Sequence, residues 1–155
     1  MARRPPLAVV LGCAGPALSD AERDFFREAD PLGFILFARN CENPNQVRGL
    51  VESMRESVGR ADAPVLIDQE GGRVARLGPP HWRVAPAMAR FGELARRSSV
   101  RATEAAWLNA RLIAAELHEL GVTVNCAPVL DVPQSGAHDI KRERASGTSA
   151  DSNKL

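Results

Sequence analysis

The chain has 155 residues, of which 45% are hydrophobic and 25% are charged, and its formal net charge at pH 7 is +1. These values are typical of one globular domain with a substantial core, and the charge argues against a general nucleic-acid or membrane-surface role. The odd number of cysteines and their wide spacing match no zinc pattern and fit reduced thiols in a cytoplasmic protein: Cys13, Cys41 and Cys126. We expect all three thiols to be buried and inert.

The N-terminus has two features of a signal peptide, a pair of arginines and the apolar run 7–11. Gly12 follows at once and a charged helix begins soon after, which favours a first strand instead. No segment approaches the ~20 consecutive apolar residues of a membrane span. We therefore expect neither a leader nor a membrane anchor.

Strands and helices alternate along the chain. Apolar runs predict strands at 7–13, 33–37, 63–66 and 122–127. Ser19 and Glu22 form a capping-box signature for a helix that runs to about Ala29, with Phe25 and Phe26 on its buried side. Asn43-Pro44 opens a second helix.

After an irregular passage from Leu77 to Pro86, a helix of about twenty residues is expected to end near Gly121, which is placed as a C-cap glycine. Its apolar stripe is expected to comprise Leu108, Leu112, Ile113 and Leu117.

Strands that alternate with crossover helices predict parallel pairing. The fold class is therefore α/β, and two architectures remain open: a small doubly wound sheet, or four β/α units of an eight-stranded (β/α) barrel. Composition does not separate them. The residues from Lys141 onward are polar and lack periodicity, so 141–155 is expected to be a disordered tail.

The segment Ile67-Asp-Gln-Glu-Gly-Gly-Arg-Val-Ala-Arg76 carries the strongest functional signal. It places two carboxylates, two glycines and two arginines at the end of a strand, where α/β proteins handle ligands. Carboxylates beside guanidinium groups can bind a polyhydroxylated or anionic ligand through charge-assisted hydrogen bonds. Two alternatives stay open from the residues alone: Asp68 and Glu70 could form an acid/base pair, and Arg73 and Arg76 could form a solvated basic face.

Two further features allow two readings each. His81-Trp82 could line the rim of a site, since indole rings stack on sugars, or could anchor a loop. Asp131 follows a strand and could either orient binding groups or cap a loop. His118 lies between charged helix residues and is expected at the surface.

Three segments in register resemble bacterial β-N-acetylhexosaminidases of the family 3 glycoside hydrolases. They are Gly33-Phe-Ile-Leu-Phe-Ala-Arg-Asn40, the segment 67–76, and Ala127-Pro-Val-Leu-Asp-Val132. The resemblance runs from about residue 7 to about residue 147. It implies a (β/α)8-type barrel, of which residues 1–140 would be the N-terminal half. It also implies a cytoplasmic enzyme of peptidoglycan recycling that removes terminal non-reducing N-acetylglucosamine and uses no cofactor or metal.

Carried over residue by residue, the resemblance makes Asp68 a hydrogen-bond acceptor for sugar hydroxyls and Arg76 a second sugar-binding residue. Arg144 would be a third, although Arg142 stands where the family usually has glycine. Glu70 would then support these groups, and Asp131 is a second candidate for a supporting role because of its position just past a strand end.

The family's Lys-His-Phe-Pro-Gly-His-Gly motif, histidine acid/base and aspartate nucleophile would lie beyond residue 155. We therefore expect no catalytic residue in this sequence, an inactive chain, and a truncated gene as the plainest hypothesis. The alternative is an amino-sugar-binding remnant or a subunit completed by another chain. Because four strands leave two open sheet edges, we also expect a marginal fold that self-associates.

Overall fold

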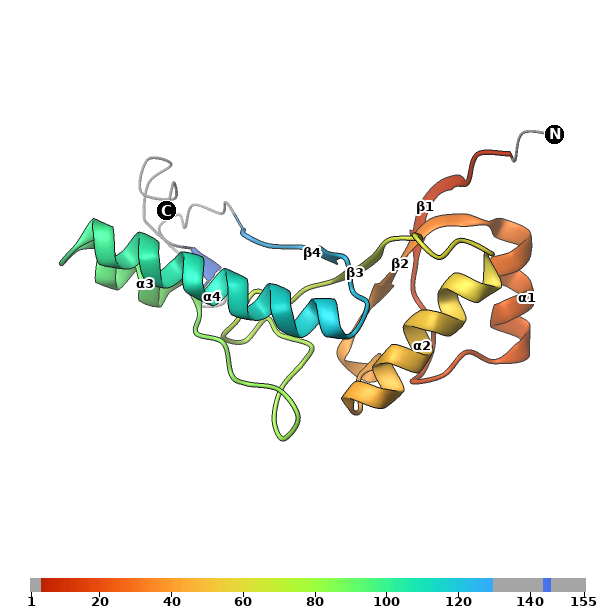
Figure 1. Cartoon of the computed structure of the whole chain (residues 1–155), viewed down its shortest axis with the longest axis horizontal. Coiled ribbons are helices and arrows are strands. Elements are labelled where there is room, and N and C mark those ends of the chain that lie inside the picture. Colours follow the sequence, from red (N-terminus) through yellow and green to blue (C-terminus); the bar gives the residue numbers. More distant parts are fainter. Residues whose placement is uncertain (1–3, 130–143, 146–155) are drawn as a thin grey trace, which may run out of the picture. The chain divides into compact units, whose positions relative to one another are not determined.

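The computed structural model describes residues 4–129 and 144–145. Figure 1 shows that the described strands are separated along the chain by helices, with α3 and α4 both between β3 and β4. Their bounds are β1 (Leu7–Leu11), α1 (Asp20–Ala29), β2 (Pro31–Leu36), a 3-10 turn (Ala38–Asn40), α2 (Pro44–Ser57), β3 (Val65–Ile67), α3 (Met88–Ala95), α4 (Ser99–Glu119) and β4 (Val124–Asn125).

The four strands form one sheet in the order β1-β2-β3-β4, and each neighbouring pair is parallel. Phe34 aligns with Val65 across β2 and β3, and Ile67 aligns with Asn125 across β3 and β4. The parallel α/β topology expected from the sequence is therefore confirmed. The fourth strand is shorter than the predicted range 122–127.

The chain divides into two compact units. Unit one contains the described residues up to Ile67 together with Leu117–Asn125, and so includes the whole sheet. Unit two contains Asp68–Glu116 and the described residues that follow Asn125.

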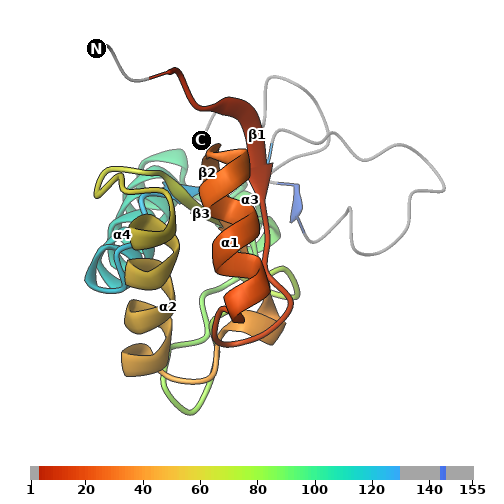
Figure 2. The ribbon, with the colours of Figure 1, turned by 90° about the vertical axis from the view of Figure 1, so that its right-hand side faces the viewer.

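Helices α1 and α2 lie side by side in unit one (Figure 2). The expected capping box opens α1, since the Ser19 hydroxyl accepts from the Glu22 amide and the Glu22 carboxylate accepts from the Ser19 amide. The helix buries Phe26, whose ring meets Phe34 edge-on at 5.1 Å. Phe25 is 54% exposed, so its predicted burial was wrong. Consecutive helix residues point about 100° apart, and α1 turns one of the two rings to the core.

The end of α4 leads into β4 through Gly121, which has φ +78° and confirms the predicted C-cap glycine. The Val122 amide donates to the Leu117 carbonyl at 3.0 Å, which closes the last turn. Arg55 of α2 donates to the Gly121 carbonyl at 2.8 Å and so ties this turn to the rest of unit one.

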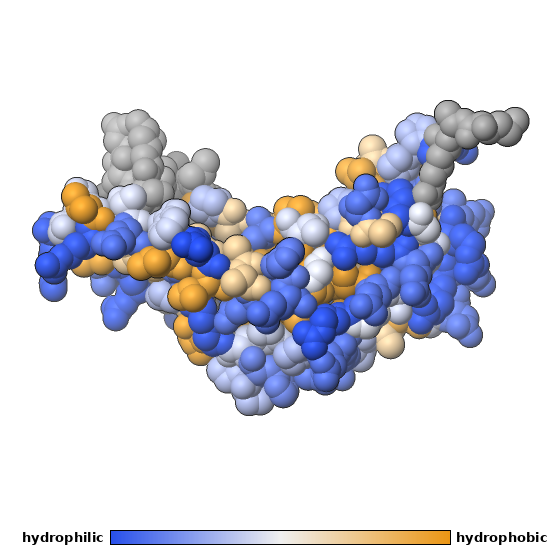
Figure 3. Space-filling model, in the orientation of Figure 1, coloured by the Kyte–Doolittle hydropathy of each residue, from blue (hydrophilic) through white to orange (hydrophobic). Residues whose placement is uncertain are grey.

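The predicted apolar stripe of α4 is half correct. Ile113 and Leu117 are buried, whereas Leu108 and Leu112 are 47% and 54% exposed. The buried face of α4 includes Asn109, which is 8% exposed, and Ile113. Leu108 directly precedes Asn109 and Leu112 directly precedes Ile113, so both leucines point to the side of this buried face. Apolar colour is visible along α4 in Figure 3. No helix among the described residues is both long and apolar enough to cross a membrane.

Candidate functional site

The segment that the sequence singled out forms one tight loop in unit two. Asp68 directly follows β3, and the loop turns back so that the amides of Glu70 and Gly71 both donate to the Val74 carbonyl, at 3.0 and 3.1 Å. Arg76 lies at the returning end of this loop. The loop therefore brings Asp68 and Arg76 together although eight positions separate them.

Both glycines of the loop are required by its geometry. Gly71 has φ +100°, and a Cβ there would lie 2.4 Å from the Pro86 carbonyl oxygen. Gly72 has φ +59°, and a Cβ there would lie 2.6 Å from the Cβ of Ala87. Side chains at these positions would be strained and would collide with the following segment.

Asp68 and Arg76 form an ion pair where the two ends of the loop meet. The distance from Arg76 Nη2 to Asp68 Oδ2 is 2.7 Å, and the side chains are 25% and 24% exposed. The arginine and the carboxylate are thus held in place but remain open to solvent. Charge-assisted bonds of this kind orient both partners without burying them.

Gln69 holds the loop from inside and was not singled out from the sequence. Its side chain is 1% exposed. The amide oxygen accepts from the backbone amides of Arg76 and Leu77 at 2.8 and 3.0 Å, and the amide nitrogen donates to the Leu77 carbonyl at 3.0 Å. Gln69 therefore fixes the backbone that carries Arg76. Its position between two acidic residues gave no sequence signal for this role.

Glu70 binds Arg144 across 74 positions of the chain. Arg144 Nε and Nη2 donate to the two carboxylate oxygens of Glu70 at 2.8 and 2.7 Å. The Glu70 side chain is 6% exposed and that of Arg144 is 30% exposed. This two-pronged geometry fixes the plane of the guanidinium group. The structure thus places Glu70, Arg76 and Arg144 in the same unit as Asp68.

Cys126 lies beside Asp68, a neighbour that sequence reasoning missed. It was expected to be buried, but the residue is exposed, whereas Cys13 is buried and Cys41 is half-buried. Partial desolvation is the main cause of a raised pKa of the Cys126 thiol, followed by the charge of Asp68, a hydrogen bond to Asp68 and the charge of Glu70. No clear sequence signal marked this position, because the predicted strand 122–127 contained Cys126, whereas in the structure Cys126 directly follows β4 as Asp68 directly follows β3.

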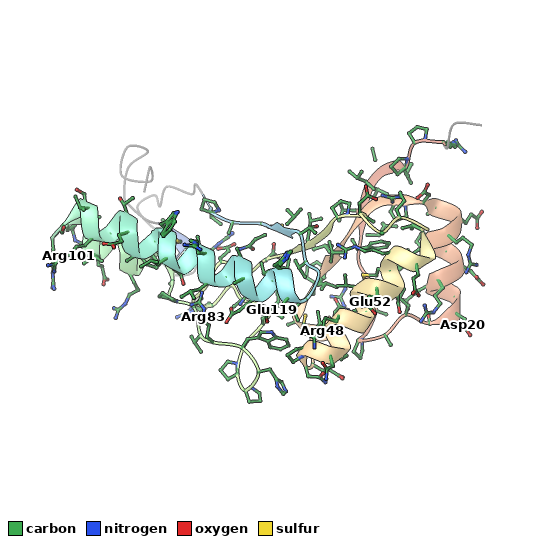
Figure 4. The ribbon with its side chains drawn as sticks, in the orientation of Figure 1. Asp20, Arg48, Glu52, Arg83, Arg101 and Glu119 are labelled. Atoms are coloured by element: carbon green, nitrogen blue, oxygen red, sulfur yellow. The ribbon has the colours of Figure 1, made fainter. Side chains whose placement is uncertain are left out.

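The passage after the loop is anchored to α4. Figure 4 labels Arg83 below this helix. The Arg83 guanidinium donates to the side-chain oxygen and the backbone carbonyl of Asn109 at 3.1 and 3.2 Å. It also forms an ion pair with Glu116 at 3.4 Å. The Gly72 amide donates to the Ala85 carbonyl at 2.9 Å, so this anchored passage also supports the glycine turn.

The other predicted residues lie elsewhere or outside the described part. His81 and Trp82 contact each other edge-on at 5.8 Å in the anchored passage. Arg73 and His118 are exposed, the latter as expected. Asp131 and the polar tail, apart from Arg144 and Ala145, lie outside the described residues. Among residues 4–129 and 144–145, no group of His, Cys, Asp and Glu side chains could hold a metal ion.

This arrangement offers acceptors and donors of opposite charge that are fixed in space and partly open to solvent. Such a set suits a neutral ligand with many hydroxyl groups, because hydroxyls both donate to carboxylates and accept from guanidinium groups. The charges also balance pairwise, so the site does not favour a strongly ionic ligand.

Comparison with known proteins identifies the family. The model of the glycosyl hydrolase family 3 N-terminal domain matches residues 11–152. The chain belongs to this family. It is 41% identical to a beta-hexosaminidase of Methylococcus capsulatus over 84% of this chain and 37% of the relative. A beta-hexosaminidase of Bordetella avium is 37% identical over 83% of this chain and 36% of the relative. The chain thus spans little more than a third of these relatives.

Solved structures of family 3 relatives confirm the fold class as α/β of the parallel (β/α) barrel type. NagZ from Neisseria gonorrhoeae, solved in complex with a zinc ion, matches with a TM-score of 0.86 and 27% identity. The match covers 96% of this chain and 44% of that chain. NagZ in complex with N-trifluoroacetyl-D-glucosamine matches with a TM-score of 0.85 at the same identity, over 96% and 44% of the two chains.

Proposed function

We propose that the loop 68–76 and Arg144 form the sugar-binding part of a β-N-acetylhexosaminidase site. The observation that carries the proposal is the partly exposed ion pair of Asp68 and Arg76 at a strand end. The relatives of this chain within its family include beta-hexosaminidases. A relative of known structure was solved with an N-acylated glucosamine, which supports an amino sugar as the ligand.

Each residue has a specific part in this proposal. Asp68 accepts hydrogen bonds from sugar hydroxyls through its two carboxylate oxygens, and Arg76 donates to a neighbouring sugar oxygen while it holds Asp68. Arg144 is a second donor, and Glu70 orients it through the two bonds between them. Asp131 is proposed as a supporting residue only from its expected position just past a strand end.

The finer functional statements rest on the same resemblance. We propose that the reaction releases terminal non-reducing N-acetylglucosamine from peptidoglycan fragments, in the cytoplasm and as part of peptidoglycan recycling. We also propose that residues 1–140 form part of one hydrolase domain followed by the tail 141–155. Self-association through open strand edges is a further proposal, which sedimentation at several protein concentrations would test.

The proposal predicts whether this chain can cleave a glycoside by itself. None of its 155 residues is assigned as nucleophile or acid/base, so it should bind the sugar without cleaving its glycosides. A retaining glycosidase needs two such groups on either side of the bond. The purified chain at high concentration should therefore leave an aryl N-acetyl-β-glucosaminide intact, and turnover that is lost in Asp68→Ala would contradict this assignment.

The binding proposal is tested by titration of the chain with N-acetylglucosamine, followed by NMR signals of the sugar. Asp68→Asn removes a charged acceptor worth about 1.5–3 kcal/mol, so the affinity should fall by about tenfold or more. Asp24→Asn is the matched control, because Asp24 forms an exposed ion pair with Arg27 on α1. Equal affinities for Asp68→Asn and Asp24→Asn, or no binding by the unmodified chain, would reject the proposed site.

A further inference from the structure

Cys126 directly follows β4, at the position that corresponds to Asp68 directly after β3. The two strands are parallel, with Leu66 aligned with Val124 and Ile67 with Asn125. Asp68 and Cys126 are the next residues, one past the end of each strand. Residues aligned across parallel strands direct their side chains to the same side of the sheet, about 5 Å apart. Continued by one residue, this register places the thiol and the carboxylate side by side just past the strand ends.

The contacts of Cys126 agree with this register. The thiol lies near enough to the Asp68 carboxylate for the hydrogen bonding and charge of that group to raise the pKa of the thiol, and the charge of Glu70 adds to this rise. A thiol is a weak donor, whereas the carboxylate of Asp68 has several acceptor positions, one of them occupied by Arg76 at 2.7 Å. Asp68 thus lies beside both a guanidinium group and a thiol while keeping 24% of its side chain exposed.

The exposure of Cys126 separates it from the other cysteines of the chain. Cys13 is buried, and its thiol donates to the Gly15 carbonyl at 3.3 Å; Cys41 is half-buried, and its thiol donates to the Phe37 carbonyl at 3.5 Å. Both thiols thus bond to nearby backbone. The thiol of Cys126 instead lies beside the Asp68 carboxylate, which we assign to the sugar.

We propose that Cys126 lines the amino-sugar subsite and shares the Asp68 carboxylate with the bound sugar. A sugar hydroxyl that approaches Asp68 replaces the weak thiol donor with a stronger one and places the sugar ring over the sulfur. Cys126 is therefore a binding residue that also limits the room beside Asp68. This inference rests on the proposed function, since it assumes that Asp68 contacts the sugar.

The inference is tested by the rate at which iodoacetamide alkylates Cys126, with and without N-acetylglucosamine. The thiolate sulfur displaces iodide, and mass spectrometry of the peptides assigns the product to each cysteine. At a sugar concentration ten times its Kd, about one site in eleven is empty, so alkylation of Cys126 should slow about tenfold. Cys41 is the internal control, and its rate should stay constant.

In a second measurement, Cys126 is alkylated first and sugar binding is measured afterwards. In a Cys41→Ser background, alkylation at Cys126 should abolish binding of N-acetylglucosamine, because the added carboxamidomethyl group occupies the space beside Asp68. The Cys41→Ser change retains a hydroxyl donor for the Phe37 carbonyl and removes the other accessible thiol.

The outcomes separate this inference from the proposed function. If the sugar binds but neither protects Cys126 nor is blocked by its alkylation, Cys126 does not line the subsite and the proposed function stands. If the sugar does not bind the unmodified chain, both proposals are overturned. If the rates at Cys126 and Cys41 slow equally, the effect is general and the inference is also overturned.

Discussion

Asn40 and Asp68 each follow a strand of the sheet, yet their surroundings are opposite. Asn40, in unit one, is 0% exposed and bonds mainly to backbone: its amide nitrogen donates to the carbonyls of Cys13 and Gly15 at 3.2 and 2.8 Å, and its oxygen accepts from the Phe37 amide at 2.9 Å. Asp68, in unit two, is 24% exposed and bonds to the side chain of Arg76.

This difference distinguishes a polar residue that builds the fold from one that is available to a ligand. Bonds from a buried side chain to backbone satisfy groups that have no other partner, so they cannot be exchanged without cost. A bond between two partly exposed side chains can be exchanged for bonds to a ligand. The comparison therefore predicts that changes near Asn40 affect stability, whereas changes to the exposed side chains near Asp68 affect binding.

The largest expected effect comes from the backbone that supports the site. Gly71→Ala should lower the free energy of unfolding by about 3 kcal/mol, because the new Cβ meets the Pro86 carbonyl and strains a positive φ. Denaturant unfolding followed by the fluorescence of Trp82 and Trp107 would measure it. Gly78→Ala is the control, since no atom lies within 4 Å of its Cβ position; equal effects of the two changes would contradict the geometry.

Asn40→Ala should cost about 2 kcal/mol of unfolding free energy, because it leaves buried backbone groups of unit one without partners. Circular dichroism during urea unfolding would report the loss. Asn45→Ala, at an exposed position in the first turn of α2, should change the stability by less than about 0.5 kcal/mol. Loss of sugar affinity in the folded Asn40→Ala variant would break the distinction between the two regions.

Arg144→Lys should weaken N-acetylglucosamine binding by about three- to tenfold with little loss of stability. Lysine keeps the charge but cannot make the two parallel bonds to Glu70, so the donor is no longer oriented. Sugar titration would measure the change. Arg101→Lys, on the exposed surface of α4, is the matched control; an unaltered affinity in Arg144→Lys would remove Arg144 from the site.

The smallest expected effect concerns acid stability in unit one. Hydrogen bonds from the Ala14 and Ser19 amides lower the pKa of Glu22. A lowered folded pKa stabilises the native state above the unfolded pKa of about 4.3 and loses this contribution as the pH falls through the folded value. Glu22→Gln should therefore show a flatter stability profile below about pH 5 than the parent chain. If exposed Glu28→Gln flattens the profile equally, the capping contact is not the cause.

The sequence predicted local features well and partnerships poorly. The Ser19 capping box, the Gly121 C-cap and the parallel strand order follow from spacing and residue type, and all were confirmed. The bond between Glu70 and Arg144 joins positions 74 apart, so only the resemblance suggested that Arg144 approaches the site. The exposure of Phe25 could not be predicted, because adjacent phenylalanines give no indication of which one faces the core.

The most direct test of the account is a map of backbone amide shifts during titration with N-acetylglucosamine. The account predicts that the shifts concentrate in residues 68–77 and at Cys126 and Arg144, and that the amides of residues 37–41 around Asn40 stay unchanged. Shifts centred on residues 37–41, or no shifts in the loop 68–77, would contradict the assignment of Asp68 and Arg76 as the sugar-binding pair.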